Sequence, residues 1–199
     1  MTTFYLIRHA SNDFFPHTLV GRNPGIHLNG TGQREAEQLA ERLAGEGIEK
    51  IFSSPMERCR ETAEPLAAKC NLNVEISGAL NEVDFGDWAG RAFAELDQLE
   101  KWKQWNTFRS GARATNGETM FEVQNRVVGF LEKLSRERAG QRIALVSHGD
   151  PIRAVILYFL GTPLEFIRRI EISPASVSIL SIGDWEAQIR CLNARHVQA

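Results

Sequence analysis

Two histidines and two arginines occupy places in the chain where they could handle a phosphoryl group. Arg8 and His9 directly follow one apolar run, His148 follows another, and Arg58 stands early in the helix after a third. The planar fork of arginine offers paired donors to phosphate oxygens and keeps its charge at any working pH. A neutral histidine can attack phosphorus to form a phosphohistidine, and a second can donate a hydrogen bond as charge shifts in the transition state. The set predicts phosphoryl chemistry.

A group of carboxylates lies in the loop between residues 79 and 90, at Glu82, Asp84 and Asp87. The leaving oxygen of a phosphate ester needs a proton. A carboxylic acid that is near a dense positive site and partly buried can supply it. We expect Glu82 in this role, with Asp84 or Asp87 as substitutes.

Short apolar runs alternate with helical patterns, which predicts an α/β fold. Strands are expected at residues 4–7, 48–53, 74–76 and 143–147, and a terminal hairpin at 177–182 and 187–192. Strands separated by helices form a mostly parallel central sheet with helices on both faces, in three layers, here with an antiparallel edge strand or hairpin. Ligands of such sheets gather outside the carboxyl ends of the strands. If the strands are neighbours, both histidines and both arginines face one crevice.

Polar residues mark the expected helix starts. Asn29 is expected to cap the first helix, and Ser54 to Glu57 match a capping box with Pro55 as the first helical residue. Asp150 followed by proline has the same meaning later in the chain. One helix is expected through residues 93–102. For Glu118, capping of a helix is preferred over a position facing the crevice.

Composition and charge exclude several classes of function. The chain has 199 residues, which suits a single domain over 1–199, and its net charge is −2, so no overall field attracts nucleic acid or an anionic membrane. No signal peptide or membrane-spanning run is visible. The three cysteines are odd in number and form no Cys-x-x-Cys pair, so we expect no zinc site and a reducing, cytoplasmic location.

In these residues the chain resembles the histidine phosphatase, or phosphoglycerate mutase-like, superfamily. The resemblance covers most of the chain. It rests on Leu6–Ala10, Leu28–Gly32, Ser53–Pro55 through Arg58 to Ala63, Leu80–Glu82 with Gly86–Gly90, Gly117–Thr119 and Val146–Gly149. It implies that His9 is the phosphorylated nucleophile, that Arg8, Arg58 and His148 clamp the phosphoryl group, and that Glu82 is the general acid and base. It implies no metal and no dissociable cofactor.

Substrate contacts are expected from Asn12, Gly21, Arg22 and Gly149, with the loop of residues 10–27 at the entrance. For Arg22, contact with the substrate and plain solvation are equally expected. A solvated helix face is the preferred interpretation for the basic residues Lys101, Lys103, Arg109 and Arg113. Inward packing is preferred for Cys59, and a surface position for His27 and His196.

The leading hypothesis is a metal-independent phosphomonoesterase that acts on a small phosphorylated metabolite. The alternatives are a mutase of the phosphoglycerate type, a non-catalytic module that binds phosphorylated partners and, more weakly, a metallohydrolase. The mutase pattern has a serine and an asparagine where this chain has Asn12 and Phe15, which argues against a mutase. The identity of the substrate and the choice between monomer and homodimer stay open.

Overall fold

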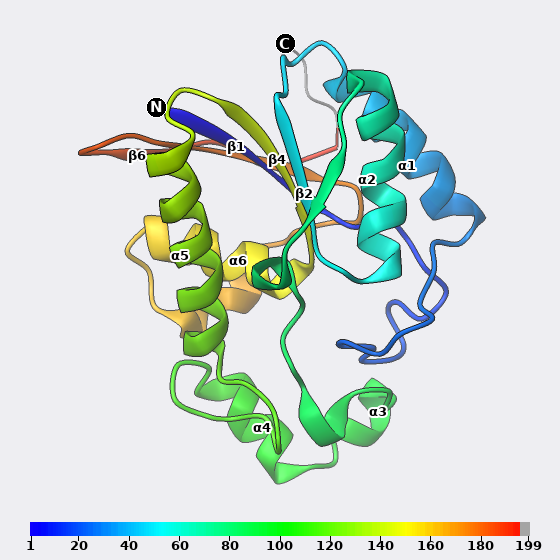
Figure 1. The fold of residues 1–199 in the computed structure, drawn as a ribbon. Coiled ribbons are helices and arrows are strands. Elements are labelled where there is room, and N and C mark those ends of the chain that lie inside the picture. Colours follow the sequence, from blue (N-terminus) through cyan, green and yellow to red (C-terminus); the bar gives the residue numbers. More distant parts are fainter. Residues whose placement is uncertain (196–199) are drawn as a thin grey trace.

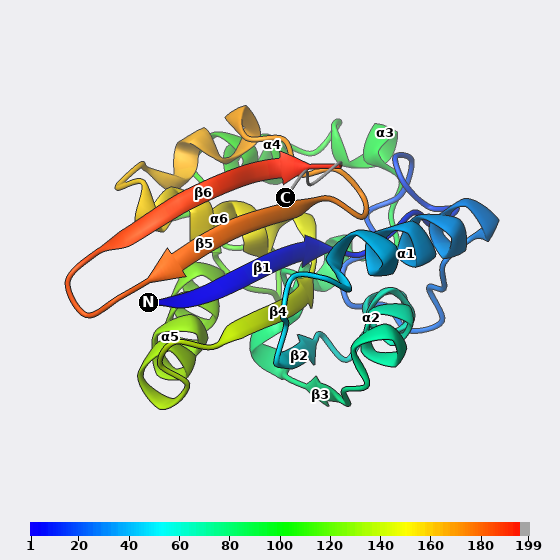
Figure 2. The same cartoon turned by 90° about the horizontal axis from the view of Figure 1, so that it is seen from above.

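The computed structural model describes residues 1–195, so His196 lies outside the described part. A six-stranded sheet has the order β3-β2-β4-β1-β5-β6 (Figures 1 and 2). Its strands are β1 (Thr2–Arg8), β2 (Lys50–Ser53), β3 (Val74–Ile76), β4 (Arg142–Ser147), β5 (Val177–Ile182) and β6 (Ala187–Ala194). The first four are mutually parallel, whereas β5 runs antiparallel to β1 and pairs with β6 as a hairpin. The predicted α/β class and the antiparallel edge are confirmed.

Alternation along the strands divides the core between the two faces of the sheet. Phe4 and Leu6 of β1 pack with α5 (Met120–Glu137) and α6 (Gly149–Phe159). Tyr5 and Ile7 pack on the other face with the apolar sides of α1 (Gly30–Leu43) and α2 (Glu57–Cys70). Successive side chains of a strand point to opposite faces, so a run that is apolar throughout must be covered twice. Figure 1 shows these three layers.

A third apolar cluster lies beyond the carboxyl ends of the parallel strands. It contains Trp88, Trp102 and Trp105 and includes α3 (Phe93–Leu96) and α4 (Glu100–Thr107). The single helix expected through 93–102 is therefore wrong. The chain leaves the helical conformation at Leu99, and the Asp97 carboxylate accepts a hydrogen bond from Trp102 Nε1, which joins the two short helices.

The cap at Asn29 is confirmed, since its side chain accepts from the Gly32 amide. The capping box at Ser54 is wrong, because α2 begins at Glu57 after Met56. The Ser54 hydroxyl contacts Asn81 and His148, and the one amide it accepts from near the helix start within residues 1–195 is that of Met56, at 3.4 Å. Within residues 1–195 the fold also has three 3₁₀ helices, η1 (Gly78–Leu80), η2 (Gly86–Trp88) and η3 (Leu164–Arg169).

Two further expected caps are also replaced. His148, not Asp150, precedes the first residue of α6, and the Asp150 carboxylate instead accepts from two arginines. Thr119, not Glu118, caps α5 in a reciprocal capping box with Glu122. Both carboxylates have guanidinium partners, which carry a full positive charge that a helix amide lacks.

Among residues 1–195, no helix combines the length and the apolar character needed to cross a membrane.

Candidate active site

The register of the sheet places the two histidines side by side. Arg8 of β1 pairs with Ser147 of the adjacent parallel strand β4, so the next residues, His9 and His148, leave the sheet together. Their ring centroids are 5.2 Å apart, edge to face. Arg58, from α2 after the neighbouring β2, lies with Nη2 3.0 Å from His148 Nδ1. The structure thus brings together the two histidines and two arginines singled out from the sequence.

A backbone carbonyl fixes the proton of His9. The carbonyl oxygen of Ala10 lies 2.8 Å from His9 Nδ1, and since a carbonyl can only accept, Nδ1 carries the hydrogen. The other ring nitrogen, Nε2, is therefore unprotonated in the neutral ring. Burial, and then the charges of Arg58 and Arg8, hold the pKa of His9 well below its ordinary value. The ring is neutral at neutral pH and has one nucleophilic nitrogen.

His148 has the opposite tautomer. Arg58 Nη2 can only donate, so His148 Nδ1 accepts, and Nε2–H donates to the Ser54 hydroxyl at 2.9 Å. That hydroxyl donates in turn to Asn81 Oδ1 at 3.0 Å. The His148 side chain is fully buried behind His9 and, in this conformation, does not line the cavity described below.

The two arginines have buried donors without acceptors. Arg8 donates from Nη1 to the Ile172 carbonyl at 2.6 Å, and Arg58 donates from Nη2 to the Gly21 carbonyl at 2.8 Å. Arg8 Nε and Arg58 Nε and Nη1 have no partner anywhere in residues 1–195. Buried charged donors are costly to leave unpaired, so they point to an anionic ligand.

A cavity of about 470 Å³ opens beside these groups. Arg8, His9, Arg58 and Glu82 line it, as do the expected substrate contacts Asn12, Gly21 and Gly149. Asn12 accepts from the amides of Phe14 and Phe15 through its Oδ1, which orders the entrance loop. Phe15 also lines the cavity, with its ring centroid 4.8 Å from Arg8 Cζ.

Of the three acidic residues in the loop, only Glu82 lines the cavity. Burial, together with the charge of Asp150, raises the pKa of Glu82 to about 7. Asp84 Oδ1 accepts from the Gly86 amide, and the exposed Asp87 pairs with Asn116. Neither is placed to substitute for Glu82.

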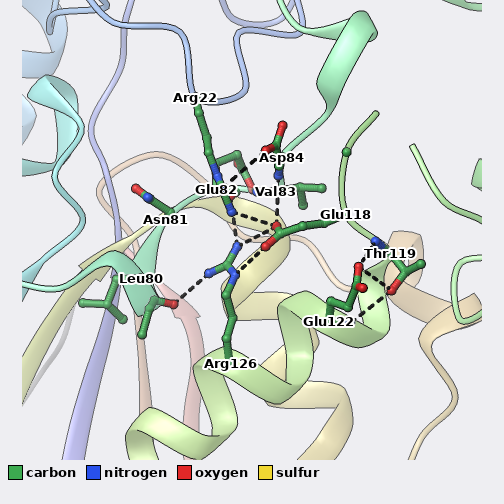
Figure 3. A network of polar contacts seen from close by, with 12 residues as sticks. Arg22, Leu80, Asn81, Glu82, Val83, Asp84, Glu118, Thr119, Glu122 and Arg126 are labelled. Atoms are coloured by element: carbon green, nitrogen blue, oxygen red, sulfur yellow. Dashed lines mark hydrogen bonds and ion pairs between the residues drawn. The ribbon is translucent and has the colours of Figure 1, made fainter. Parts of the chain in front are cut away.

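Arg22 lies outside the cavity and binds the backbone of the Glu82 loop instead. The Glu82 carbonyl accepts from Arg22 Nε at 2.8 Å and from Arg126 Nη2 at 3.0 Å (Figure 3). Glu118 lies between the two guanidiniums, bonded to both, and also accepts from the Asp84 amide. No sequence pattern marks this network, because its members come from three distant segments.

A glycine permits the close contact of two loops beside this network. Gly117 packs against the Glu82 loop, and a Cβ there would lie 2.2 Å from the Asp84 carbonyl oxygen. The adjacent Glu118 amide donates to that same oxygen at 2.8 Å. Any side chain at residue 117 would force the two loops apart.

Three further arginines line the cavity, and the expectations from the sequence did not include this position for any of them. Arg109, expected on a solvated helix face, is only 5% exposed, and Arg153 and Arg168 line the same cavity. Arg153 stands four residues after Gly149 in α6, a spacing that places both on one helix face and could have indicated it. No sequence signal points to Arg109 or Arg168, because tertiary packing decides their positions.

Cys59 is fully buried, as expected from inward packing, and burial raises the pKa of its thiol to about 12. In residues 1–195, no three His, Cys, Asp or Glu side chains are grouped so that they could hold a metal ion.

Comparison with known proteins agrees with this geometry. The family model described as histidine phosphatase superfamily (branch 1) matches residues 4–195. Phosphoserine phosphatase 1 of Hydrogenobacter thermophilus is 31% identical over 97% of this chain and 92% of its own. A probable phosphoglycerate mutase, GpmB, of Proteus mirabilis is 32% identical over 89% and 84%. The crystal structure of the alpha-ribazole phosphatase from Shigella flexneri superposes with a TM-score of 0.88 at 28% identity, covering 99% of this chain and 98% of that one.

Proposed function

The chain belongs to the histidine phosphatase superfamily (branch 1), and from this premise we propose that it hydrolyses phosphate monoesters of small metabolites through a phosphohistidine at His9. The proposal is carried by the guanidinium donors of Arg8 and Arg58 that have no partner among residues 1–195, which lie beside the unprotonated Nε2 of His9. These donors suit the oxygens of a phosphoryl group, and the nitrogen suits its phosphorus.

In the first step, His9 Nε2 attacks phosphorus and the bond to the ester oxygen breaks. Glu82, whose pKa of about 7 keeps much of it protonated, gives its proton to the leaving oxygen. Arg8 and Arg58 stabilise the charge on the remaining phosphoryl oxygens. His148, which donates to the Ser54 hydroxyl and contacts the ring of His9, orients the nucleophile.

In the second step, Glu82 removes a proton from water, the water oxygen attacks phosphorus, and the nitrogen–phosphorus bond breaks. Inorganic phosphate and neutral His9 result. No metal takes part in either step. The free cysteines Cys59, Cys70 and Cys191 fit a reducing compartment, and we place the enzyme in the cytoplasm.

The replacement His9→Ala tests the proposal. We expect turnover of p-nitrophenyl phosphate to fall to the background rate, while His27→Ala, at an exposed histidine, keeps the native rate. EDTA should leave the native rate unchanged. Brief exposure to labelled substrate should give acid-labile label on the native protein and none on the variant. Retained turnover in His9→Ala would refute the proposal.

Transfer of the phosphoryl group to a second acceptor, as in a mutase, is the second candidate, favoured by the likeness to the GpmB protein. Phe15 weighs against it, because a phenyl ring stands where the mutase pattern has a side chain that binds phosphate. Assay of phosphoglycerate interconversion beside phosphate release separates the two.

A further inference from the structure

The cavity has a positive wall that the proposed phosphoryl chemistry does not use. Arg109, Arg153 and Arg168 form it, and they line the cavity in addition to Arg8 and Arg58. In all, five arginines and three carboxyl groups line the cavity of a protein whose net charge is −2. The cavity is therefore locally positive and suited to an anionic ligand, although the protein as a whole is slightly negative.

Arg109 is held rigidly. Its Cζ lies 3.7 Å from the centroid of the Trp105 ring, Nη2 donates to Asn106 Oδ1 at 2.6 Å, and Nη1 lies 3.4 Å from Asp150 Oδ2. Its Nε is buried and has no acceptor in residues 1–195. A guanidinium fixed by stacking and by two polar contacts, with a donor left over, is organised in advance for an anion.

Arg153 connects this wall to the phosphoryl site. It donates from Nε to the Ile170 carbonyl and from Nη1 to Asp150 Oδ1, at 2.8 and 2.9 Å. A Cβ on Gly149 would lie 3.3 Å from Arg153 Nη1 and 3.6 Å from Arg8 Nε. The glycine therefore lets two guanidiniums approach the same point, and the positive charge continues from Arg8 through Arg153 to Arg109.

Asp150 only partly neutralises this wall. One carboxylate contacts both Arg109 and Arg153, and Asp97, also on the wall, is bonded to Trp102 Nε1. Arg168, which is exposed at the rim, adds a third positive charge. A structural role for the pair Arg109–Asp150 alone would explain neither the Arg109 Nε, which lacks an acceptor in the described part of the chain, nor the two further arginines.

We propose that this wall is a subsite for a second anionic group of the substrate, a carboxylate held by Arg109 and Arg153 while Arg8 and Arg58 hold the phosphoryl group. The inference rests on the proposed function and narrows its substrate class to short phosphorylated carboxylic acids. A carboxylate matches the planar guanidinium fork, and continuity of the wall with Arg8 suits two anions separated by a few bonds.

Two probes that differ only in this group give the test. 3-Phosphoglycerate and glycerol 3-phosphate are three-carbon monoesters in which a carboxylate is exchanged for a hydroxymethyl group. We expect kcat/KM of the native enzyme to be about 10- to 100-fold higher for 3-phosphoglycerate, the factor that a charged hydrogen-bonded contact provides. A ratio of one or below overturns the inference.

Variants assign the effect to the wall. In Arg109→Met, the ratio of kcat/KM for the two probes should fall to near one, and in Arg168→Met, at an exposed side chain that tolerates replacement, it should fall in part. Lys101→Met removes a positive charge from the outer surface of α4 and should keep the native ratio. Because both probes are measured on the same variant, loss of folded protein cancels. A native ratio in both arginine variants overturns the inference.

The two proposals fail differently. If the native protein hydrolyses neither probe nor p-nitrophenyl phosphate, the proposed function is wrong and the subsite falls with it. If p-nitrophenyl phosphate is hydrolysed and the carboxylate gives no advantage, only the subsite is wrong.

Discussion

Desolvation shifts the pKa values of two residues of the site in opposite directions. Burial disfavours the charged form of any group, so it lowers the pKa of the His9 imidazole and raises that of the Glu82 carboxyl to about 7. Arg8 and Arg58 lower the pKa of His9 further, whereas Asp150 raises that of Glu82. A neutral nucleophile and a protonated acid therefore coexist near neutral pH, as phosphorylation of the enzyme requires.

This pairing predicts the pH dependence of kcat/KM. Glu82 must be protonated in the first step, so kcat/KM should fall as pH rises through about 7. Asp150→Asn removes the negative charge that raises the pKa of Glu82, and the fall should move to lower pH. Measurement of kcat/KM against pH checks this, because ionisation of the substrate is the same for both enzymes. Asp87→Asn, at an exposed residue of the loop that carries Glu82, should leave the pH at which kcat/KM falls unchanged. An identical profile for native enzyme and Asp150→Asn would contradict the assignment of Glu82.

At the scale of elements, the candidate acid lies in a loop that other segments must hold. The Glu82 carbonyl accepts from Arg22 of the entrance loop and from Arg126 of α5, and Glu118 joins the two arginines (Figure 3). The start of α5 is fixed separately by the Thr119 capping box. Position of the acid and stability of the helix therefore depend on neighbouring but different residues.

Replacements of these two neighbours should separate the two roles. Glu118→Gln loses the charged contact with both arginines, so kcat should fall about tenfold, the effect of about 1.4 kcal/mol on the barrier. Thr119→Ala loses the helix cap and should lower the free energy of unfolding by about 1 kcal/mol with kcat unchanged. Steady-state kinetics and urea denaturation of both variants check this. If Glu118→Gln lowers only stability, Glu118 does not position Glu82.

At the scale of the whole molecule, the burial of two neutral imidazoles makes the free energy of unfolding depend on pH. The pKa values of His9 and His148 lie well below the ordinary value because burial and then Arg58 oppose protonation. In the unfolded chain both take up protons near pH 6.5. The unfolded state therefore binds more protons below this pH, and the fold loses stability as pH falls.

Urea denaturation at pH 7.5 and 5.5 measures this loss. Each buried histidine should lower the free energy of unfolding by about 1.4 kcal/mol over this range. In a variant that carries both His9→Asn and His148→Asn, no imidazole titrates at these two positions. Its free energy of unfolding should therefore fall less between pH 7.5 and 5.5, by the summed contribution of the two histidines. His27, whose pKa is raised by Glu61, acts in the opposite direction but is present in both proteins and cancels. An equal pH dependence in the two proteins would contradict the burial of neutral rings.

The sequence by itself determined the sheet and the residues at its carboxyl edge. Apolar runs such as Ile143–Ser147 must be covered on both faces of the sheet. The residues that follow parallel strands meet at one edge, so the sequence alone predicts that Arg8, His9 and His148 lie close together, as they do. Only the tertiary structure decided which polar side chains turn inward. Arg109 stacks on Trp105 and faces the cavity, whereas Arg22 donates to the Glu82 carbonyl. The Asp150 carboxylate binds two guanidiniums and does not cap α6. Periodicity records which face of an element is apolar, but the partner of a charged side chain depends on contacts between segments far apart in the chain.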